Sequence, residues 1–477
     1  MLFQEYSMEL VSRIYDVFKS FFPFEPTPGQ DETMQRISGF LADKSQKLFV
    51  VGGYAGTGKT TLVRALVELL PHIKYKSILL APTGRAAKVL SNYTRKKAFT
   101  IHKYIYFTAG EEGGDFKSFS IKPNKSNYTV FIVDEASMIG DNGYEYNLLE
   151  DLISFVFEGI GCKLIFIGDS AQLPPVGASV SPALNVKQLE RDYHIPVSWG
   201  ALRDVMRHEQ NSGILFNATQ LRLQIKEKAT DFQFYLKSFN DIIRIEGGEL
   251  EDELNSCYSK YGFDETLIIT RNNKRANLFN HQTRARIRYF EEELSAGDLL
   301  MVVKNNYFWM PQKSGLSFIA NGDTIEIQKV KSIYDMYGFR FAEVRIVMPD
   351  YDEIPAFDVT LLLDTINAET PALSSMQQQD LYNQVMLDLM HITDKSKRYQ
   401  ELKKNEYFNA LQVKFAYAVT CHKAQGGQWK AVFIDQGYLS DEMLNTDFLR
   451  WLYTAITRAT EKVYLVNFAD KFFKENN

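Results

Sequence analysis

The chain has 477 residues, enough for two to four domains with sizeable hydrophobic cores. That length excludes a small disulfide-stapled or metal-nucleated module. Apolar residues make up 45% and charged residues 24%, which is typical of a folded globular protein. The formal net charge of −5 argues, taken alone, against a polyanionic partner.

The cysteine spacing and the amino-terminal residues indicate the compartment. Cys162, Cys257 and Cys421 lie far apart without CxxC spacing, so neither a zinc cluster nor a disulfide framework is expected. Glu5 and Glu9 stand where a secretory signal would carry cations, and no apolar run approaches the roughly 18 residues of a membrane span. We therefore expect a cytoplasmic protein without membrane association.

Four short apolar runs alternate with helical segments in the first third of the chain. These runs are Leu48–Val51, Ile78–Ala81, Val130–Val133 and Leu164–Ile167. Continuous apolar runs of this length are typical of strands buried on both faces of a parallel sheet. The segment Lys103–Tyr128 interrupts the alternation with three glycines between aromatic-rich flanks, and predicts a β-hairpin inserted between two core strands.

A second α/β region is predicted from about Leu202, with an interruption. Its expected strands are Leu267–Thr270, Ala431–Ile434 and Val463–Val466. Short strands with turns between residues 297 and 348 predict a small β-barrel within this region. The polar segment from residue 361 to residue 408 has helical spacing and is interpreted as a helical extension of the insertion.

The strongest motif is GYAGTGKT, at residues 53–60, between a predicted strand and a predicted helix. Glycines in such a loop let backbone N–H groups face phosphate oxygens. Lys59 would contact the terminal phosphates, and Thr60 can supply an oxygen to Mg²⁺. The residues predicted to bind the nucleotide here are Gly56, Thr57, Gly58, Lys59, Thr60 and Thr61.

Two adjacent carboxylates end the predicted strand in VFIVDEAS. Asp134 would hold Mg²⁺, and Glu135 could orient or deprotonate the attacking water. Together with the phosphate loop, these acids predict an NTPase but do not distinguish kinases, GTPases and motors.

Five further strings follow in a fixed order: APTGRAAKVL (81–90), TIH (100–102), GDSAQLPPVG (168–177), TCHKAQG (420–426) and YTAITRA (453–459). They resemble motifs Ia, Ib, III, V and VI of the superfamily 1 helicases. The QLPPV version and the preceding TIH are similar to the 5′-to-3′ branch, superfamily 1B, of the RecD and phage Dda type. The resemblance extends from Gln30 to Arg458.

This resemblance implies an α/β fold with two RecA-like P-loop motor domains. Residues 1–204 would form domain 1A, with an N-terminal helix at 1–20 and a duplex-splitting pin hairpin, 1B, at 103–128. Domain 2A would comprise 205–296 and 411–477. The inserted residues 297–410 would be an SH3-like β-barrel, 2B, with a helical extension, and NGDTIEI is the clearest matching fragment.

The resemblance also assigns roles around the nucleotide. Gln30 would read the adenine edge, and Gln172 would lie near the γ-phosphate and link hydrolysis to the nucleic-acid site. Arg207 and Arg458 would reach the γ-phosphate from the second motor domain, and Gly426 is a further predicted nucleotide contact. Cations supplied from a different domain would make hydrolysis depend on closure of the cleft.

For nucleic acid, the resemblance implies contacts to phosphates and bases that do not read sequence. The predicted residues are Pro82, Thr83, Thr100, His102, Thr420, His422 and Lys423, with Phe116 and Phe119 at the hairpin tip. For His102 a structural role in a core or loop remains an alternative, and for the two phenylalanines so does hairpin packing. Asn-Pro, expected after TIH, is replaced by Thr108-Ala109.

Residues 71–128 carry eleven lysines and arginines against three acids, a local net charge of +8. This run is either a solvated face or a strand-binding face, and its position around TIH and the hairpin favours strand binding.

We therefore expect a monomeric DNA helicase that uses ATP and Mg²⁺, moves 5′-to-3′ on single-stranded DNA and acts at single-strand/duplex junctions. The alternatives are an RNA helicase or RNA-dependent NTPase of the same superfamily, and a DNA-binding loader or remodeller that does not unwind. Protein partners are not identified by the sequence.

Overall fold

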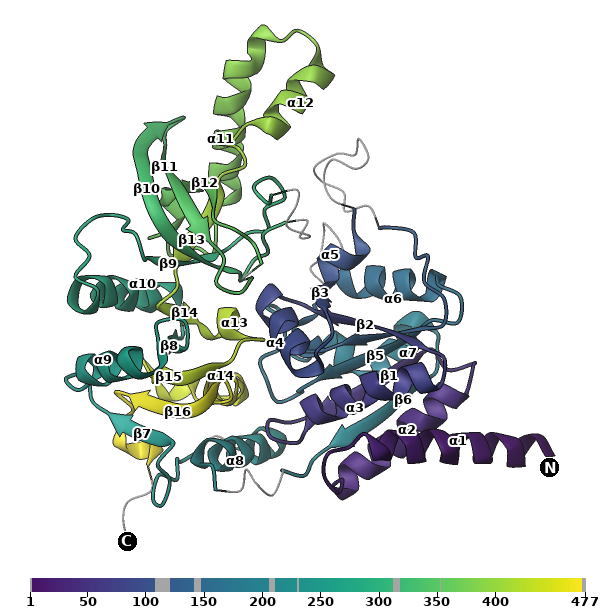
Figure 1. Ribbon diagram of the computed structural model, residues 1–477. Coiled ribbons are helices and arrows are strands. Elements are labelled where there is room, and N and C mark those ends of the chain that lie inside the picture. Colours follow the sequence, from purple (N-terminus) through teal and green to yellow (C-terminus); the bar gives the residue numbers. More distant parts are fainter. Residues whose placement is uncertain are drawn as a thin grey trace.

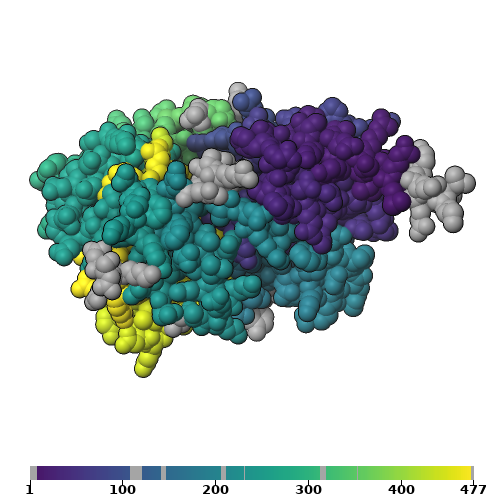
Figure 2. Space-filling view, turned by 90° about the horizontal axis from the view of Figure 1, so that it is seen from below, coloured from purple at the N-terminus to yellow at the C-terminus, as the bar shows by residue number. Residues whose placement is uncertain are grey.

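The computed structural model describes residues 2–107, 121–140, 147–205, 211–229, 231–311, 318–351 and 353–473, with side chains from residue 8 onward. Two parallel sheets and a closed barrel form three parts that lie around a common centre (Figure 1). Seen from below, the purple and blue surface of the first sheet's part lies beside the teal and yellow surface of the second (Figure 2). Within the described residues, no helix combines the length and the apolar character needed to cross a membrane.

The first lobe contains a six-stranded sheet in the order β3-β2-β4-β5-β1-β6. All its neighbouring strands are parallel. The strands are β1 Leu48–Gly53, β2 Lys76–Ala81, β3 Ala98–Thr100, β4 Thr129–Val133, β5 Lys163–Gly168 and β6 Val197–Leu202. All five residues of β4 are buried, as expected for an apolar strand covered by helices on both faces.

Helices cover both faces of this first sheet. The bounds are α1 Leu2–Ser20, α2 Pro28–Ala42, α3 Lys59–His72, α4 Gly84–Thr94, α5 Ile101–Ile105, α6 Leu148–Glu158 and α7 Val186–Tyr193. One hydrophobic cluster joins one face of the sheet to α1, α2, α3 and Leu90 of α4. A second cluster joins the opposite face to α5, α6 and α7. The carboxyl ends of the strands are left for the loops that carry the motifs.

The strand predictions for the first sheet agree with β1, β2, β4 and β5, but β3 and β6 were not predicted. Both lie at sheet edges, where burial is incomplete and an apolar run is not required. The hairpin prediction for Lys103–Tyr128 is wrong at its start, because α5 continues through Ile105 before an antiparallel bridge joins Tyr106 and Ile121. Residues 108–120 lie outside the described part of the chain.

The second lobe contains a five-stranded sheet in the order β14-β8-β15-β16-β7, again entirely parallel. Its strands are β7 Ile242–Ile245, β8 Thr266–Thr270, β14 Ala418–Thr420, β15 Trp429–Asp435 and β16 Ala459–Val466. Its helices are α8 Gly213–Glu227, α9 Leu250–Tyr261, α10 Asn273–Gln282, α13 Cys421–Ala424 and α14 Thr446–Ile456. Helices α8 and α14 pack on one face, and α9 and α10 on the other.

The barrel is inserted into the second lobe and closes in the order β10-β11-β12-β13-β9. Its strands are β9 Leu299–Val302, β10 Thr324–Met336, β11 Phe339–Val347, β12 Phe357–Leu362 and β13 Leu411–Phe415. Helices α11 Ser375–Asp388 and α12 Lys395–Lys404 form an arm that projects from the barrel (Figure 1). Because β13 pairs with β9 and β12, the chain completes the barrel before it returns to the second sheet at β14.

The predicted fold class, two parallel P-loop-type domains with a β-barrel and helical extension inserted in the second, is confirmed. Short turns of 3-10 helix connect several elements: Ala136–Met138, Pro182–Leu184, Leu363–Thr365, Leu389–His391, Asp441–Met443 and Asp470–Phe472. A π-helical turn, Thr283–Ile287, continues α10.

Candidate functional site

The phosphate loop connects β1 to α3. Gly56 and Gly58 have φ angles of 69° and 83°, a left-handed conformation that side chains disfavour. Lys59 is the first residue of α3, and its Nζ donates hydrogen bonds to the carbonyl oxygens of Gly53 and Tyr54, at 2.8 and 2.9 Å. A Cβ on Gly53 would lie 2.7 Å from Cγ of Lys59, so glycine is required where the lysine folds along the loop. The ammonium group is thereby held at the mouth of the loop.

The remaining predicted nucleotide contacts surround this loop. Thr60 is exposed and Thr61 half-buried in the first turn of α3, whereas Thr57 is buried and its Oγ1 donates to the Tyr54 carbonyl at 2.7 Å. Only Thr60 therefore presents an exposed hydroxyl of the kind that Mg²⁺ can use.

Gln30, predicted to read adenine, is buried beside the phosphate loop. Its Nε2 donates to the carbonyl oxygen of Thr57 at 3.0 Å, and its Oε1 accepts from the backbone N–H of Thr27 at 2.9 Å. The second bond belongs to the capping box that starts α2. In this structure the glutamine amide fixes the loop to α2.

The two carboxylates lie directly after β4. The backbone N–H of Glu135 donates to Oδ1 of Asp134 at 2.9 Å, and the hydroxyl of Tyr93 donates to Oδ2 at 2.5 Å. Burial and the neighbouring Glu135 raise the pKa of Asp134 above its ordinary value. Burial also raises the pKa of Asp169, which follows β5. Carboxylates with raised pKa values in a cleft are typical of functional sites.

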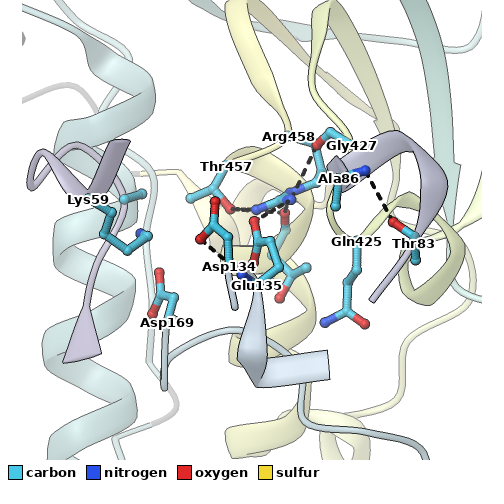
Figure 3. A network of polar contacts seen from close by, with 12 residues as sticks. Lys59, Thr83, Ala86, Asp134, Glu135, Asp169, Gln425, Gly427, Thr457 and Arg458 are labelled. Carbon is cyan, nitrogen blue, oxygen red and sulfur yellow. Dashed lines mark hydrogen bonds and ion pairs between the residues drawn. The ribbon is translucent and has the colours of Figure 1, made fainter. Parts of the chain in front are cut away.

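Arg458 reaches these acids from the second lobe. Its Nη1 lies 3.7 Å from Oε1 of Glu135, and the exposed fractions of the two side chains are 4% and 18%. The guanidinium also donates to the carbonyl oxygens of Thr454 and Gly427, at 3.1 and 3.2 Å. Figure 3 shows Asp134 and Glu135 between Lys59 on one side and Arg458 on the other. Arg207, the second predicted arginine, lies outside the described residues.

The segment after β5 joins the two lobes at this site. Leu173 and Ala171 are buried in the hydrophobic cluster of the second lobe. The backbone of Leu173 donates to Oγ1 of Thr454 at 2.8 Å and accepts from Nε2 of Gln425 at 2.8 Å. Gln172 is also buried, and its Oε1 has no hydrogen-bond partner among the described residues. An unpaired buried amide oxygen is costly, which is consistent with a group kept ready for a ligand.

Three residues that make contacts at this site, Tyr453, Arg222 and Tyr93, were not predicted from the sequence. The hydroxyl of Tyr453 accepts from the Ala55 N–H of the phosphate loop at 2.9 Å and donates to Asp169 at 2.5 Å. Arg222, on α8, lies 4.3 Å from the ring centre of Tyr54. Tyr453 begins the string YTAITRA, so a signal was present, whereas Arg222 and Tyr93 belong to no recognised string.

The donor set fits Mg²⁺ bound together with a nucleotide. Within the described ranges, no cluster of three histidine, cysteine or acidic side chains could hold a metal unaided. Mg²⁺ usually takes one or two carboxylates and completes its shell with water and phosphate oxygens. Thr60 and Asp134 supply such oxygens, and Oε2 of Glu135 is buried without a partner in the part of the chain described.

The predicted strand contacts follow strand ends in both lobes. Thr83 follows β2, whereas Thr100 and Thr420 are the last residues of β3 and β14. The three threonines occupy the N-cap positions of α4, α5 and α13. The hydroxyls of Thr83 and Thr100 accept from backbone N–H groups of their helices, at 3.2 and 3.3 Å. The structure thus places these threonines in equivalent local positions at the carboxyl ends of the sheets.

The two histidines differ in exposure. His102 is half-buried in α5, 5.7 Å from the ring of Tyr106, and burial lowers its pKa to about 4. His422 is exposed, although partial burial lowers its pKa as well. Burial lowers the pKa of Lys423 to about 7, and its Nζ has no partner among the described residues.

Pro82 is half-buried beside Thr83. Gly426 has a φ of 74°, and a Cβ there would lie 3.0 Å from Cβ of Ala86 and 3.2 Å from Oγ1 of Thr83. Gly426, which was predicted to contact the nucleotide, therefore lies beside Thr83, which was predicted to contact nucleic acid. Phe116 and Phe119 lie outside the described residues.

A cleft of about 340 Å³ separates α4 and β3 from the barrel. Lys97, Lys103 and Thr100 line one side, and Asp323 and Glu353 line the other. The cleft thus joins part of the basic run of the sequence to acids of the barrel.

Comparisons with known proteins agree with this geometry. Residues 39–178 match the family model described as AAA domain, and residues 415–466 match the one described as UvrD-like helicase C-terminal domain. The ATP-dependent RecD2 DNA helicase of Deinococcus radiodurans is 35% identical over 35% of this chain and 21% of that protein. The ATP-dependent DNA helicase Dda of Enterobacteria phage T4 is 33% identical over 31% of this chain and 33% of that protein.

A longer match, at lower sequence identity, extends over most of the chain. An uncharacterized protein of Acanthamoeba polyphaga mimivirus is 23% identical over 91% of this chain and 98% of that protein. The chain therefore spans a fifth to a third of the two helicases named above, and nearly all of the viral protein.

Proposed function

We propose that this chain is an ATP-dependent DNA helicase of superfamily 1B that moves 5′-to-3′ on single-stranded DNA, and its matches to the two family models and to the RecD2 and Dda helicases support this assignment. The observation that carries the proposal is the approach of Arg458 to Glu135. It brings a cation of the second lobe to the acids beside the phosphate loop of the first. Hydrolysis at such a site responds to the relative position of the lobes.

The nucleotide would bind with its terminal phosphates between Lys59 and Arg458. The Lys59 ammonium would exchange its two loop carbonyls for β- and γ-phosphate oxygens. Arg458 would turn from Glu135 to the γ-phosphate, where a guanidinium stabilises the charge of the transition state.

The released Glu135 would then orient the attacking water and take its proton. Thr60 and Asp134 would hold Mg²⁺, which supplies positive charge to the phosphate oxygens when bound.

The strand would lie along the carboxyl ends of both sheets, where Thr83, Thr100 and Thr420 occupy the N-cap positions of their helices. Hydroxyls and backbone amides contact phosphates without reading bases, which suits a motor that must move over any sequence. Lys423, whose ammonium has no partner in the described part of the chain, would gain a phosphate as its counter-charge.

The segment Asp169–Leu173 would couple the two sites, because it touches the phosphate loop through Tyr453 and the second lobe through Thr454 and Gln425. We also propose that the motor works as a cytoplasmic monomer.

The test is unwinding of two partial duplexes, one with a 5′ tail and one with a 3′ tail. Each is incubated with ATP, with a non-hydrolysable analogue, and with the Lys59→Ala variant as control. We expect opening of the 5′-tailed substrate with ATP alone. Opening from the 3′ tail would overturn the polarity, and strand-stimulated ATPase without opening would indicate a remodeller.

A parallel measurement addresses the kind of nucleic acid. Stimulation of ATPase by deoxy-oligonucleotides should exceed stimulation by ribo-oligonucleotides of the same sequence. The opposite order would indicate an RNA-dependent enzyme, because only RNA offers the 2′-hydroxyl.

A further inference from the structure

We propose that Tyr93 is a positioning residue that orients the carboxylate of Asp134 for Mg²⁺. The inference rests on the proposed function, in which Asp134 holds the metal that accompanies ATP. Tyr93 belongs to none of the strings that carry the helicase resemblance, and it lies 41 residues before Asp134 in the chain.

The two oxygens of the Asp134 carboxylate are held from two directions. The hydroxyl of Tyr93 donates to Oδ2 at 2.5 Å, and the N–H of Glu135 donates to Oδ1 at 2.9 Å. Each carboxylate oxygen can accept about two hydrogen bonds, so each keeps a site for a water of the metal shell. Two donors on separate elements fix the plane of the carboxylate, which one donor could not do.

Tyr93 is itself held firmly. It lies in the last turn of α4, and its ring packs against the hydrophobic cluster of the first sheet. The hydroxyl of a tyrosine ordinarily ionises only at about pH 10, so it is a hydrogen-bond donor at neutral pH. A phenylalanine would keep the ring contacts and lose only the hydroxyl.

The same helix begins at the predicted strand contact. Thr83 caps α4 at one end, and Tyr93 meets Asp134 at the other. The hydrogen bond of Tyr93 therefore connects the metal-holding acid to an element that touches the nucleic-acid side.

Residues that hydrogen-bond to a metal ligand affect how tightly the metal binds, so loss of the Tyr93 hydroxyl should change the affinity for Mg²⁺. Groups that orient a ligand typically change metal affinity by about 10- to 100-fold when removed. Tyr93→Phe should therefore weaken the Mg²⁺-dependent part of nucleotide binding by about 10-fold. Binding of the nucleotide without metal should stay at the wild-type value, because the hydroxyl that is removed bonds to Asp134.

The experiment measures binding of a fluorescent ADP analogue to the full chain, first in EDTA and then during a titration with Mg²⁺. Tyr106→Phe is the matched control, because Tyr106 also lies in the first lobe and donates to a carboxylate, Asp151, at 2.6 Å. We expect the half-saturating Mg²⁺ concentration to rise about 10-fold in Tyr93→Phe and to stay unchanged in Tyr106→Phe.

A double variant checks that Tyr93 acts through Asp134. In the background of Asp134→Asn, the change Tyr93→Phe should add no further loss of Mg²⁺-dependent binding. An additional loss of the full size would overturn the inference, since the hydroxyl would then act elsewhere.

Two other results would also overturn it: an unchanged Mg²⁺ titration in Tyr93→Phe, or an equal loss of binding in EDTA, which would indicate general packing. If the wild-type chain binds the ADP analogue with no dependence on Mg²⁺, the proposed function fails together with the inference. If binding to the wild type depends on Mg²⁺ and Tyr93→Phe behaves like the wild type, the inference about Tyr93 fails and the proposed function stands.

Discussion

Two of the contacts that the first lobe makes with the rest of the chain differ in kind. On the nucleotide side, the segment after β5 is buried in the core of the second lobe and joined to it by directional hydrogen bonds. Arg450 adds two more, from its guanidinium to the carbonyl oxygens of Ser170 and Gln172, at 2.7 and 3.2 Å. This contact combines hydrophobic packing with hydrogen bonds between the two lobes.

The second contact lies between α4 and the barrel, where the nucleic-acid strand is proposed to bind, and we call it the strand side. Its contacts are made by charged side chains. Lys88 of α4 pairs with Asp350 of the barrel at 3.2 Å, and the exposed fractions of these side chains are 32% and 13%. Asp323 reaches the first residue of α4, since a Cβ on Gly84 would lie 2.0 Å from its Oδ1. Beside these contacts lies the cleft of about 340 Å³.

This difference indicates which of the two contacts holds the lobes in a fixed relative position and which can rearrange. Hydrogen bonds between buried backbone groups and fixed side chains tolerate little displacement. Half-exposed ion pairs contribute about 0–1 kcal/mol and rearrange readily. We infer that the nucleotide side keeps the catalytic groups in register, while the strand side can open and close around its ligand.

The largest expected effect is on the nucleotide side. Lys59→Ala should reduce ATP turnover by at least about 100-fold, because it removes a cation from the transferring phosphate. Binding of single-stranded DNA, followed by fluorescence anisotropy, should stay within about twofold of the wild type, since the Lys59 ammonium donates to carbonyl oxygens of its own loop. Normal hydrolysis in this variant would contradict the assignment of the phosphate loop.

The next effect concerns the cation from the second lobe. Arg458→Ala should lower kcat by about 100- to 1,000-fold, the effect typical of removing one group that stabilises charge in a transition state. Nucleotide affinity should fall much less, so kcat and binding must be measured separately. Arg458→Lys is the control, and it should not restore the rate, because the ammonium lacks the planar fork that also bonds Thr454 and Gly427.

These two residues illustrate what the sequence could predict. Lys59 and the acids Asp134 and Glu135 lie in short strings whose local geometry fixes their position, so their place could be predicted. The partner of Arg458 required the folded chain, because it lies more than 300 residues away.

Tyr93 marks the limit of such prediction. Its contact depends on how α4 packs against β4, and no local pattern encodes that. The edge strands were not predicted for the same reason. Strand β6 (VSWGAL) forms because it pairs with β1, and its sequence is not an apolar run.

A smaller effect would test whether the nucleotide side is as rigid as its bonds imply. Thr454→Val removes the hydroxyl that accepts from the buried N–H of Leu173. Leaving that donor unpaired costs about 1–3 kcal/mol, so the melting temperature should fall by several degrees. Thr360→Val in the barrel is the control, because its buried hydroxyl has no partner among the described residues and its loss should be neutral or stabilising. Equal shifts in the two variants would contradict the comparison.

The smallest effect concerns the strand side and its response to pH. Burial raises the pKa of Asp323 to about 7, although the backbone N–H of Ala320 and the hydroxyl of Tyr351 both donate to the carboxylate. Asp350 opposes its ionisation, and Lys103 favours it. Between about pH 4 and 7 the folded chain holds a proton that the unfolded chain has released, so this contribution to stability falls as pH rises through 7.

For a carboxyl with this pKa, the loss between pH 6 and pH 8 is about 1 kcal/mol. Asp323→Asn cannot ionise, so its melting temperature should decrease less than that of the wild type between these two values, both measured in the same buffers and salt. A difference between the two proteins that does not change with pH would show that the Asp323 carboxyl keeps one charge state between pH 6 and pH 8. The strand side would then be as firmly set as the nucleotide side, because its charge would be fixed over the whole working range.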